Sequence, residues 1–385
     1  MKLCRICPDF PEKEGGGGVE LHIYYLTKEQ KKFDIDINIV TTGEPVGTKN
    51  FDGVKVHRVK RKKFFQFTSG FDILKTADRL ATTEKFDVLQ IHNPLVLPIF
   101  PKNLSSIPFV FSIHSSLMDF KNLFSIKSLH QSVRSFLEFY LVSKKFCEKA
   151  AKITTGSSDE KYELVKYLGI DEDKIVPVLG KANPKYFKPG VKSNLKEKLK
   201  LEGPVVLSIG RFIRKKGYTY LIRAFRKVVN EIPNANLVLV GYKQDDEEYS
   251  TITKMIKIFK LEKNIKLLPL APKKELIYYY SMCDLYVQPS ISEGFPQTVQ
   301  DVMCCAKPVI VSAAYGPKDV IKDNYNGFVV QKRDSETLAE RIIELLQDED
   351  KMKLFGKRNR TMAVKELDWK ITARKHYEIY KEIVR

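Results

Sequence analysis

Two carboxylates follow a short apolar run in the last third of the chain. The run "CDLYVQPS", residues 283–290, is typical of a strand that crosses a sheet, and Glu293 comes just after it. Pro296 favours the first turn of a helix, which places Asp301 about a turn and a half into that helix. Ionised carboxylates only accept hydrogen bonds, so they suit the vicinal hydroxyls of a polyol. The spacing predicts a site for two polyols, such as a sugar and a ribose.

A glycine and two basic residues at another strand end could hold the phosphates of such a ligand. In "LSIGRFIRKKG", residues 207–217, Gly210 ends an apolar strand, and Arg211 and Lys216 lie on the loop before the next helix. Arginine grips phosphate oxygens in pairs, lysine acts as a point charge, and a helix start adds N–H groups. The turn before Asp301 is expected to contribute Gly294, Phe295, Pro296, Gln297 and Thr298. The alternative is a capping acid, a solvated acid and a solvated basic turn.

A glycine run in the first half of the chain could also bind phosphate. "EGGGG", residues 14–18, lies between the first apolar strand and the first helical stretch, where parallel sheets often bind phosphate. Glycine lets a backbone approach a ligand closely, so Gly17 and Gly18 are candidates for phosphate or acceptor contact. A surface loop without a ligand is the alternative for this run.

Two histidines end strands of the first half. His92 ends "LQIH" and His114 ends "FVFSIH". Histidine is more often structural than catalytic, but two at corresponding strand ends favour a functional role for one of them. His114 is the stronger candidate because the small polar residues Ser115 and Ser116 follow it.

Strand-like and helical stretches alternate along the whole chain, a pattern that indicates parallel sheets covered on both faces. A Pro-, Lys- and Gly-rich stretch between Asn183 and Gly203 predicts a domain boundary. We expect an α/β protein of two tandem Rossmann-like, doubly wound domains facing across a cleft. They would span residues 1–185 and 186–365, with a helix at 366–385 crossing back to the first domain. Ligands of such sheets bind beyond the carboxyl ends of the strands.

The composition of the chain limits the classes of partner and the cellular location that are expected. The 385 residues have a net charge of +19, which favours an anionic partner such as a nucleotide or a membrane surface. No stretch is long and apolar enough to span a bilayer, and no signal-peptide core is recognised, so a cytoplasmic protein is expected. Six cysteines form no disulfide framework, and the pair Cys4 and Cys7 lacks a second pair at zinc spacing.

Six motifs follow one another along the chain: "GGGGVELHIYYL", "FSIH", "IGRFIRKKG", "LVLVG", "CDLYVQPSISEGFPQTVQDVM" and "GPKDVI…NGFVV". Taken in order over nearly the whole chain, they resemble the retaining, nucleotide-sugar-dependent glycosyltransferases of the GT-B fold, in the group-four family (glycosyl transferases group 1). The resemblance implies a hexosyltransferase-type enzyme that uses a nucleoside diphosphate sugar and needs neither a metal nor another cofactor. Its acceptor would be a glycan or a lipid-linked molecule.

The resemblance also implies a role for each matching residue. Glu293 would contact the donor sugar, Asp301 the ribose, and Arg211 and Lys216 the diphosphate as it leaves. His114 would touch the donor sugar, and Gly17 and Gly18 would face phosphate or acceptor.

This chain departs from the family at four places, one of which is "VLGKAN", residues 178–183, where "PNG" is usual. Asp301 stands where glutamate is usual, Ala306 where glycine is usual, and Pro269 where a glycine is usual near the loop that would bind the base. The base and the sugar therefore stay open.

Other functions are compatible with parts of the sequence. A nucleotide-sugar epimerase or a phosphorylase also uses twin domains of this kind. A non-catalytic protein could use the charge to bind a membrane surface or nucleic acid, although no basic stripe interleaved with aromatic residues resembles a nucleic-acid module. A membrane contact, at the inner face, is expected of "KRKKFF", residues Lys60, Arg61, Lys62, Lys63, Phe64 and Phe65. A solvated turn is the alternative for that stretch.

Overall fold

The computed structural model describes residues 1–11, 18–61, 66–92, 101–114, 143–294, 297–314 and 316–384. The described residues form two compact units: residues Met1–Leu179 with Trp369–Arg385, and residues Gly180–Asp368. Several predicted positions lie outside the described residues: Gly17, Lys62, Lys63, Phe64, Phe65, Phe295 and Pro296.

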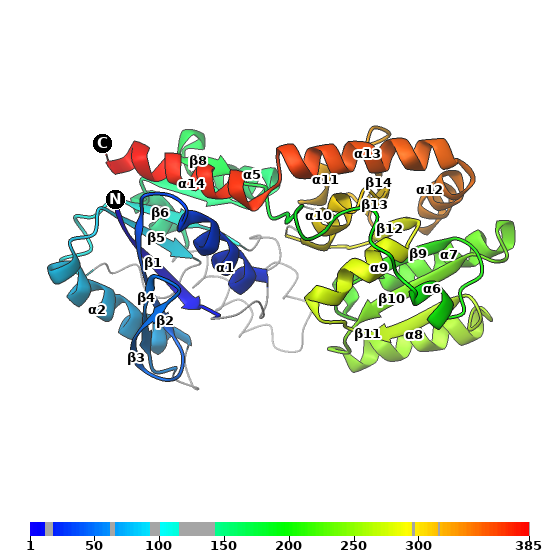
Figure 1. The fold of residues 1–385 in the computed structure, drawn as a ribbon, viewed down its shortest axis with the longest axis horizontal. Helices are drawn as coiled ribbons and strands as arrows, with labels where there is room; N and C mark the ends of the chain where they lie inside the picture. The colour runs from blue at the N-terminus through cyan, green and yellow to red at the C-terminus, as the bar shows by residue number, and fades with distance from the viewer. Residues whose placement is uncertain are drawn as a thin grey trace. The chain divides into compact units, whose positions relative to one another are not determined.

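The first unit is built on an eight-stranded sheet in the order β3-β4-β2-β1-β5-β6-β7-β8 (Figure 1). All neighbours run parallel except β3 and β4. Its strands are β1 (Lys2–Asp9), β2 (Asp36–Thr42), β3 (Gly47–Phe51), β4 (Val54–Val59), β5 (Val88–His92), β6 (Phe109–Ser112), β7 (Lys152–Thr155) and β8 (Ile175–Pro177). Its helices are α1 (Gly18–Gln30), α2 (Gln66–Glu84), α5 (Ser158–Leu168) and α14 (Trp369–Val384).

Alternation along the central strands separates two cores in this unit. Cys4 and Ile6 of β1 pack in the core that includes residues of α2 and α5, whereas Leu3 and Cys7 pack in the core that includes residues of α1 and α14. Successive side chains of a strand point to opposite faces, so Cys4 and Cys7 cannot share one metal ion. Burial also raises the pKa of the Cys7 thiol to about 12, as expected for an inert core residue.

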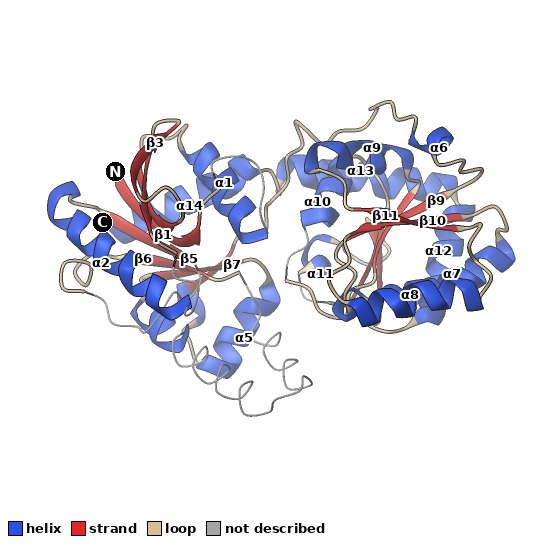
Figure 2. Cartoon of the chain, turned by 90° about the horizontal axis from the view of Figure 1, so that it is seen from below, coloured by secondary structure: helices blue, strands red, loops and turns tan. Residues whose placement is uncertain are grey.

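The second unit has a six-stranded parallel sheet in the order β11-β10-β9-β12-β13-β14, with helices on both faces (Figure 2). The strands are β9 (Val205–Ile209), β10 (Asn236–Gly241), β11 (Ile265–Pro269), β12 (Leu285–Gln288), β13 (Val309–Ser312) and β14 (Gly327–Val330). The helices are α6 (Leu195–Lys198), α7 (Tyr218–Glu231), α8 (Asp246–Ile258), α9 (Leu276–Met282), α10 (Gln297–Cys304), α11 (Pro317–Val320), α12 (Ser335–Gln347) and α13 (Glu349–Lys365). The predicted fold class, two doubly wound α/β domains, is confirmed.

The chain divides between Leu179 and Gly180 rather than at residues 185 and 186. The reason is local hydrogen bonding: the backbone N–H of Lys181 donates to Gln300 Oε1 at 2.6 Å, and that of Ala182 donates to the Leu367 carbonyl at 2.8 Å. Both contacts tie the stretch after residue 180 to the second unit. Composition alone placed the boundary in the Pro- and Lys-rich segment that follows.

Candidate active site

Two loops of the second unit meet because their strands are neighbours. Strands β9 and β12 pair in parallel, so their carboxyl ends lie at the same edge of the sheet. The backbone N–H of Ile291, after β12, donates to the Lys215 carbonyl, after β9, at 2.8 Å. Gly217 makes this approach possible: its φ is +70°, and a Cβ there would lie 2.1 Å from the Pro289 carbonyl oxygen.

Lys216 and Glu293 form an ion pair at this junction. Their side chains are only 10% and 14% exposed, so the pair is largely removed from solvent. Ser290 Oγ donates to the same carboxylate oxygen at 3.0 Å. Ser290 in turn accepts from Gln288 Nε2 at 2.8 Å, which fixes the hydroxyl that faces Glu293. One oxygen of the carboxylate is therefore held by two groups that reach it from two strand ends.

The environment keeps Glu293 ionised. Burial by itself would raise the pKa of this carboxyl, but the charge and hydrogen bond of Lys216, with Lys215 and Ser290, outweigh it and leave the pKa below its usual value of 4.5. At neutral pH Glu293 is an acceptor of hydrogen bonds and not a source of protons.

Arg211 and the start of α10 border this pair along the chain. Arg211 is half-buried, and its Nη1 donates to Gln244 Oε1 at 3.1 Å. Gly294, Gln297 and Thr298 are half-buried, and Gln297 Nε2 donates to the Lys181 carbonyl at 3.3 Å. The structure thus brings Lys216 together with Glu293, and it gives Arg211 a separate partner.

Asp301 lies inside the unit rather than on its surface. The residue is 2% exposed on α10. Its charge adds to the effect of burial in raising the pKa of the Tyr280 phenol well above its usual value. The sequence predicted a carboxylate that would hold a ribose, and the structure shows a carboxylate that is almost covered. Local spacing could not reveal this, because the covering residues come from other parts of the chain.

The backbone conformation of Ala306 shows how one departure from the expected motif is accommodated. Its φ is +56°, in the left-handed region that favours glycine. The turn after α10 therefore keeps the conformation that a glycine would adopt, although a methyl group is present.

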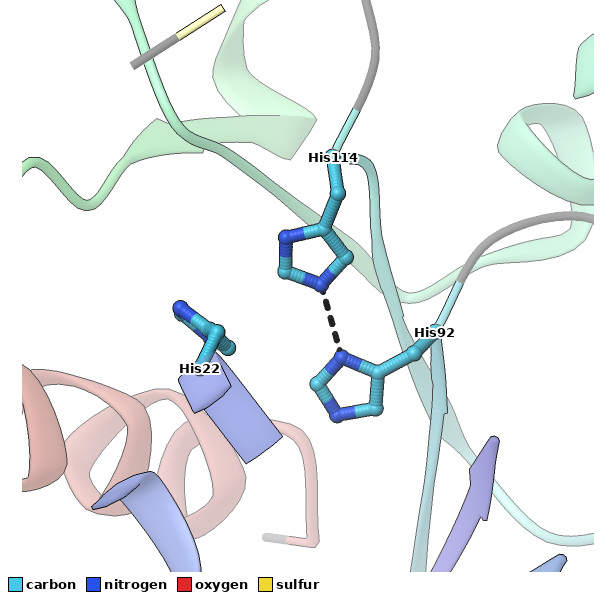
Figure 3. A group of neighbouring side chains, drawn as sticks. All are labelled: His22, His92 and His114. Atoms are coloured by element: carbon cyan, nitrogen blue, oxygen red, sulfur yellow. Dashed lines mark hydrogen bonds between the residues drawn. The ribbon is translucent and has the colours of Figure 1, made fainter. Parts of the chain in front are cut away.

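In the first unit three histidines come together (Figure 3). His22 comes from α1, and His92 and His114 come from the ends of β5 and β6; ring nitrogens of the three lie within 4.8 Å of one another. His92 and His114 were predicted to lie at strand ends of one edge, whereas His22 was missed. Gly18 opens α1 and is exposed.

A buried arginine beneath these histidines was also missed. Arg5 on β1 is fully buried, and its Nε donates to Gln90 Oε1 at 2.9 Å. Its other nitrogens bond to Thr27 and Gln30 of α1, and Tyr380 of α14 donates to Gln90 Oε1 at 2.7 Å. The signal was present, since an arginine inside the apolar strand "KLCRIC" must find polar partners when buried.

Two α/β units built on parallel sheets, one after the other in the chain, are the architecture of the GT-B glycosyltransferases. Comparisons with known proteins agree. The family model "Glycosyl transferases group 1" matches residues 192–362, and "Glycosyltransferase Family 4" matches residues 16–178. The chain therefore belongs to the group 1, family 4 glycosyltransferases, and it is an enzyme of the hexosyltransferase type.

Individual relatives cover the chain from end to end. An uncharacterised glycosyltransferase of Methanocaldococcus jannaschii is 26% identical over 388 residues, 95% of each chain. The N-acetyl-alpha-D-glucosaminyl L-malate synthase of Bacillus anthracis is 24% identical over 403 residues, covering 100% of this chain and 98% of that one. The crystal structure of Anabaena HepE in complex with UDP superposes with a TM-score of 0.77 at 17% identity, covering 99% and 100%. In the part of the chain that the structure describes, no helix is long and apolar enough to cross a membrane.

Proposed function

We propose that this enzyme transfers a sugar from a nucleoside diphosphate sugar to an acceptor hydroxyl, with retention at the anomeric carbon and without a metal ion. The observation that carries the proposal is the Lys216–Glu293 pair at the carboxyl ends of β9 and β12, where ligands of parallel sheets bind. The relatives support a sugar donor, and the HepE structure was solved with UDP.

Charge on the leaving diphosphate is met by the loop after β9. Lys216 and Arg211 provide two positive charges, and Lys215 adds a third that already acts on Glu293. Backbone N–H groups at the start of α10, a helix of eight residues, would add their dipoles. Fixed positive groups in a half-buried site stabilise developing negative charge without reorganising, which is the task that a metal performs in other transferases.

The Glu293 carboxylate accepts hydrogen bonds from hydroxyls of the donor sugar, because an ionised carboxylate is only an acceptor. The transfer then follows a front-face course. The bond from the anomeric carbon to the phosphate oxygen breaks, the bond to the acceptor oxygen forms on the same face, and the acceptor proton passes to the departing phosphate oxygen. Asp301 would hold the ribose through a carboxylate that is largely enclosed. His114, with Gly17 and Gly18, would contact the sugar and acceptor.

A thermal-shift screen against sugar nucleotides tests the proposal. A true donor raises the melting temperature by mass action, by an amount that grows with its concentration. We expect one base to be preferred among UDP-, GDP- and ADP-sugars, with the shift retained in EDTA. No shift with any member of the panel would contradict the donor assignment. NMR of the product then reads the anomeric configuration, and an inverted linkage would contradict retention.

A further inference from the structure

His92 and His114 are joined by a directed hydrogen bond. His92 Nδ1 lies 2.8 Å from His114 Nε2, and the planes of the two rings are within 7° of parallel (Figure 3). The ring centroids are 5.1 Å apart. The gap between the two nitrogens accounts for 2.8 Å of this distance, and the rest is about the length of two ring radii. Both nitrogens therefore lie close to the line between the ring centres, with an N–H on one ring pointing at the lone pair of the other.

This alignment argues against a metal ion held by the three histidines. Lone pairs of metal ligands converge on the ion, whereas those of His92 Nδ1 and His114 Nε2 face each other. The buried Arg5 guanidinium lies close enough to lower the pKa of His92, and it would also repel a divalent cation. The contact is a hydrogen bond between two imidazoles, with one proton between the two nitrogens.

His92 is the neutral partner in this pair. Burial lowers its pKa well below the usual 6.5, and His114, Arg5 and His376 lower it further. A neutral imidazole has one N–H and one bare nitrogen, and the bond that one nitrogen makes decides the state of the other. The position of the single proton on His92 therefore decides which way the hydrogen bond runs.

The surroundings of His92 Nε2 settle that position. This atom is buried, and no described residue offers it a hydrogen-bond partner. A buried N–H without a partner is less tolerable than a buried acceptor without one. The proton therefore stays on Nδ1, and His92 donates to His114 Nε2. A neutral His114 must then carry its own proton on Nδ1.

We propose that His92 is a positioning residue that holds His114 in the Nδ1–H tautomer, so that His114 presents a hydrogen-bond donor to a hydroxyl oxygen of the substrate. The consequence for substrate rests on the proposed function, in which His114 contacts the donor sugar. His22 supports the arrangement from α1, since its ring meets that of His114 edge-on at 4.6 Å and is itself backed by Trp369 at 5.2 Å.

Nitrogen NMR of the histidine-labelled enzyme, without substrate, tests the tautomer directly. The chain has six histidines, and His114→Asn assigns the resonances of His114. The wild type should show His114 protonated on Nδ1 and bare on Nε2. His92→Phe should move His114 toward the Nε2–H form, and His92→Asn should restore the wild-type pattern because its amide N–H stands near the place of Nδ1. His57→Phe is the matched control, a buried histidine of β4 that bonds to Thr48 and Asn38 instead.

Transfer assays complete the test. We expect His92→Phe to lower kcat about tenfold, the equivalent of one hydrogen bond, and His92→Asn to recover most of it. An Nε2–H tautomer of His114 in the wild type, or no change in His92→Phe, overturns the inference. The first of these outcomes is read on the wild-type protein, and His114→Asn serves only to assign its resonances. Stoichiometric binding of Co²⁺ with a tetrahedral spectrum that His92→Phe abolishes also overturns it. If the tautomers behave as expected but His114→Asn transfers normally, the sugar contact of His114 fails while the pairing stands.

Discussion

Lys216 and Glu293 are 77 residues apart in the chain and share a hydrogen-bonded ion pair at the edge where β9 and β12 end. The pair joins a group suited to phosphate with a group suited to sugar hydroxyls. Each holds the other in place before a substrate arrives. Substrate binding would therefore exchange or share contacts that are already formed.

Removing either partner should damage transfer more than folding. We expect Lys216→Ala and Glu293→Ala to lower kcat/KM by about 10²–10³, the usual cost of losing a group that stabilises transition-state charge. Lys227→Ala is a suitable control, because Lys227 also pairs with a glutamate, Glu336, but both side chains are more than half exposed. Steady-state assays and circular dichroism on all three variants decide the matter. Near-normal turnover in both site variants would remove the pair from the mechanism.

The ion pair should also leave a signature in acid stability. The folded pKa of Glu293 is lowered, so its contribution to the free energy of unfolding is complete above the usual value of 4.5 and is lost as the pH falls through the lowered value. Wild type and Glu293→Gln should therefore differ most at neutral pH and converge below pH 4.5. Urea unfolding at a series of pH values measures this. A difference that is constant with pH would contradict the ionised state of Glu293.

His376 of the first unit should affect the free energy of unfolding in a different pH range. Burial, with the charge of Arg5, lowers the pKa of His376 to about 4, although its bond to the Thr372 carbonyl opposes the shift. The unfolded chain then binds the proton first, so stability falls as the pH drops from 6.5 to about 4, by about 3 kcal/mol in all. His376→Phe, which keeps a buried ring but cannot titrate, should remove this part of the decline. An equal slope in both proteins would show that His376 is not neutral when folded.

Ala306 offers a test of backbone strain. A residue with a side chain pays about 1 kcal/mol in the left-handed region that glycine occupies freely. We expect Ala306→Gly to raise the free energy of unfolding by up to about 1 kcal/mol, offset in part by the greater freedom of glycine in the unfolded chain. Ala339→Gly, at a buried position inside α12, should instead destabilise by about 1 kcal/mol or more. A loss of stability in both variants would show that the Ala306 methyl group is well packed.

Membrane contact through residues 60–65 can be measured with vesicles. Lys60 and Arg61 are exposed, and Arg61 is paired with Asp9. Neutralising Lys60 to Lys63 should weaken binding to anionic vesicles by about 1 kcal/mol per charge removed. Less protein should then sediment with these vesicles. Lys49→Gln, at an exposed position on β3, serves as control. Equal binding of the wild type to anionic and neutral vesicles would exclude this surface.

Much of the fold follows from local pattern. Apolar runs, helical stretches and the glycines between them identify most strands and helices, and alternation of the two indicates parallel sheets. Lys216 and Glu293 were recognisable because each follows a strand end, and ends of parallel strands meet at one edge. The hairpin partner β3 was not recognised, since all of its residues are exposed or half-buried and give no apolar signal.

The sequence by itself determined the two α/β units, the basic loop after β9 and the acid after β12, because strand periodicity and turn residues act over a few neighbours. Only the tertiary structure decided that Asp301 is enclosed and that Arg5 and His22 lie beside the predicted histidines. These outcomes depend on which distant segments pack together. Burial and proton positions are set by those contacts, and no spacing along the chain contains them.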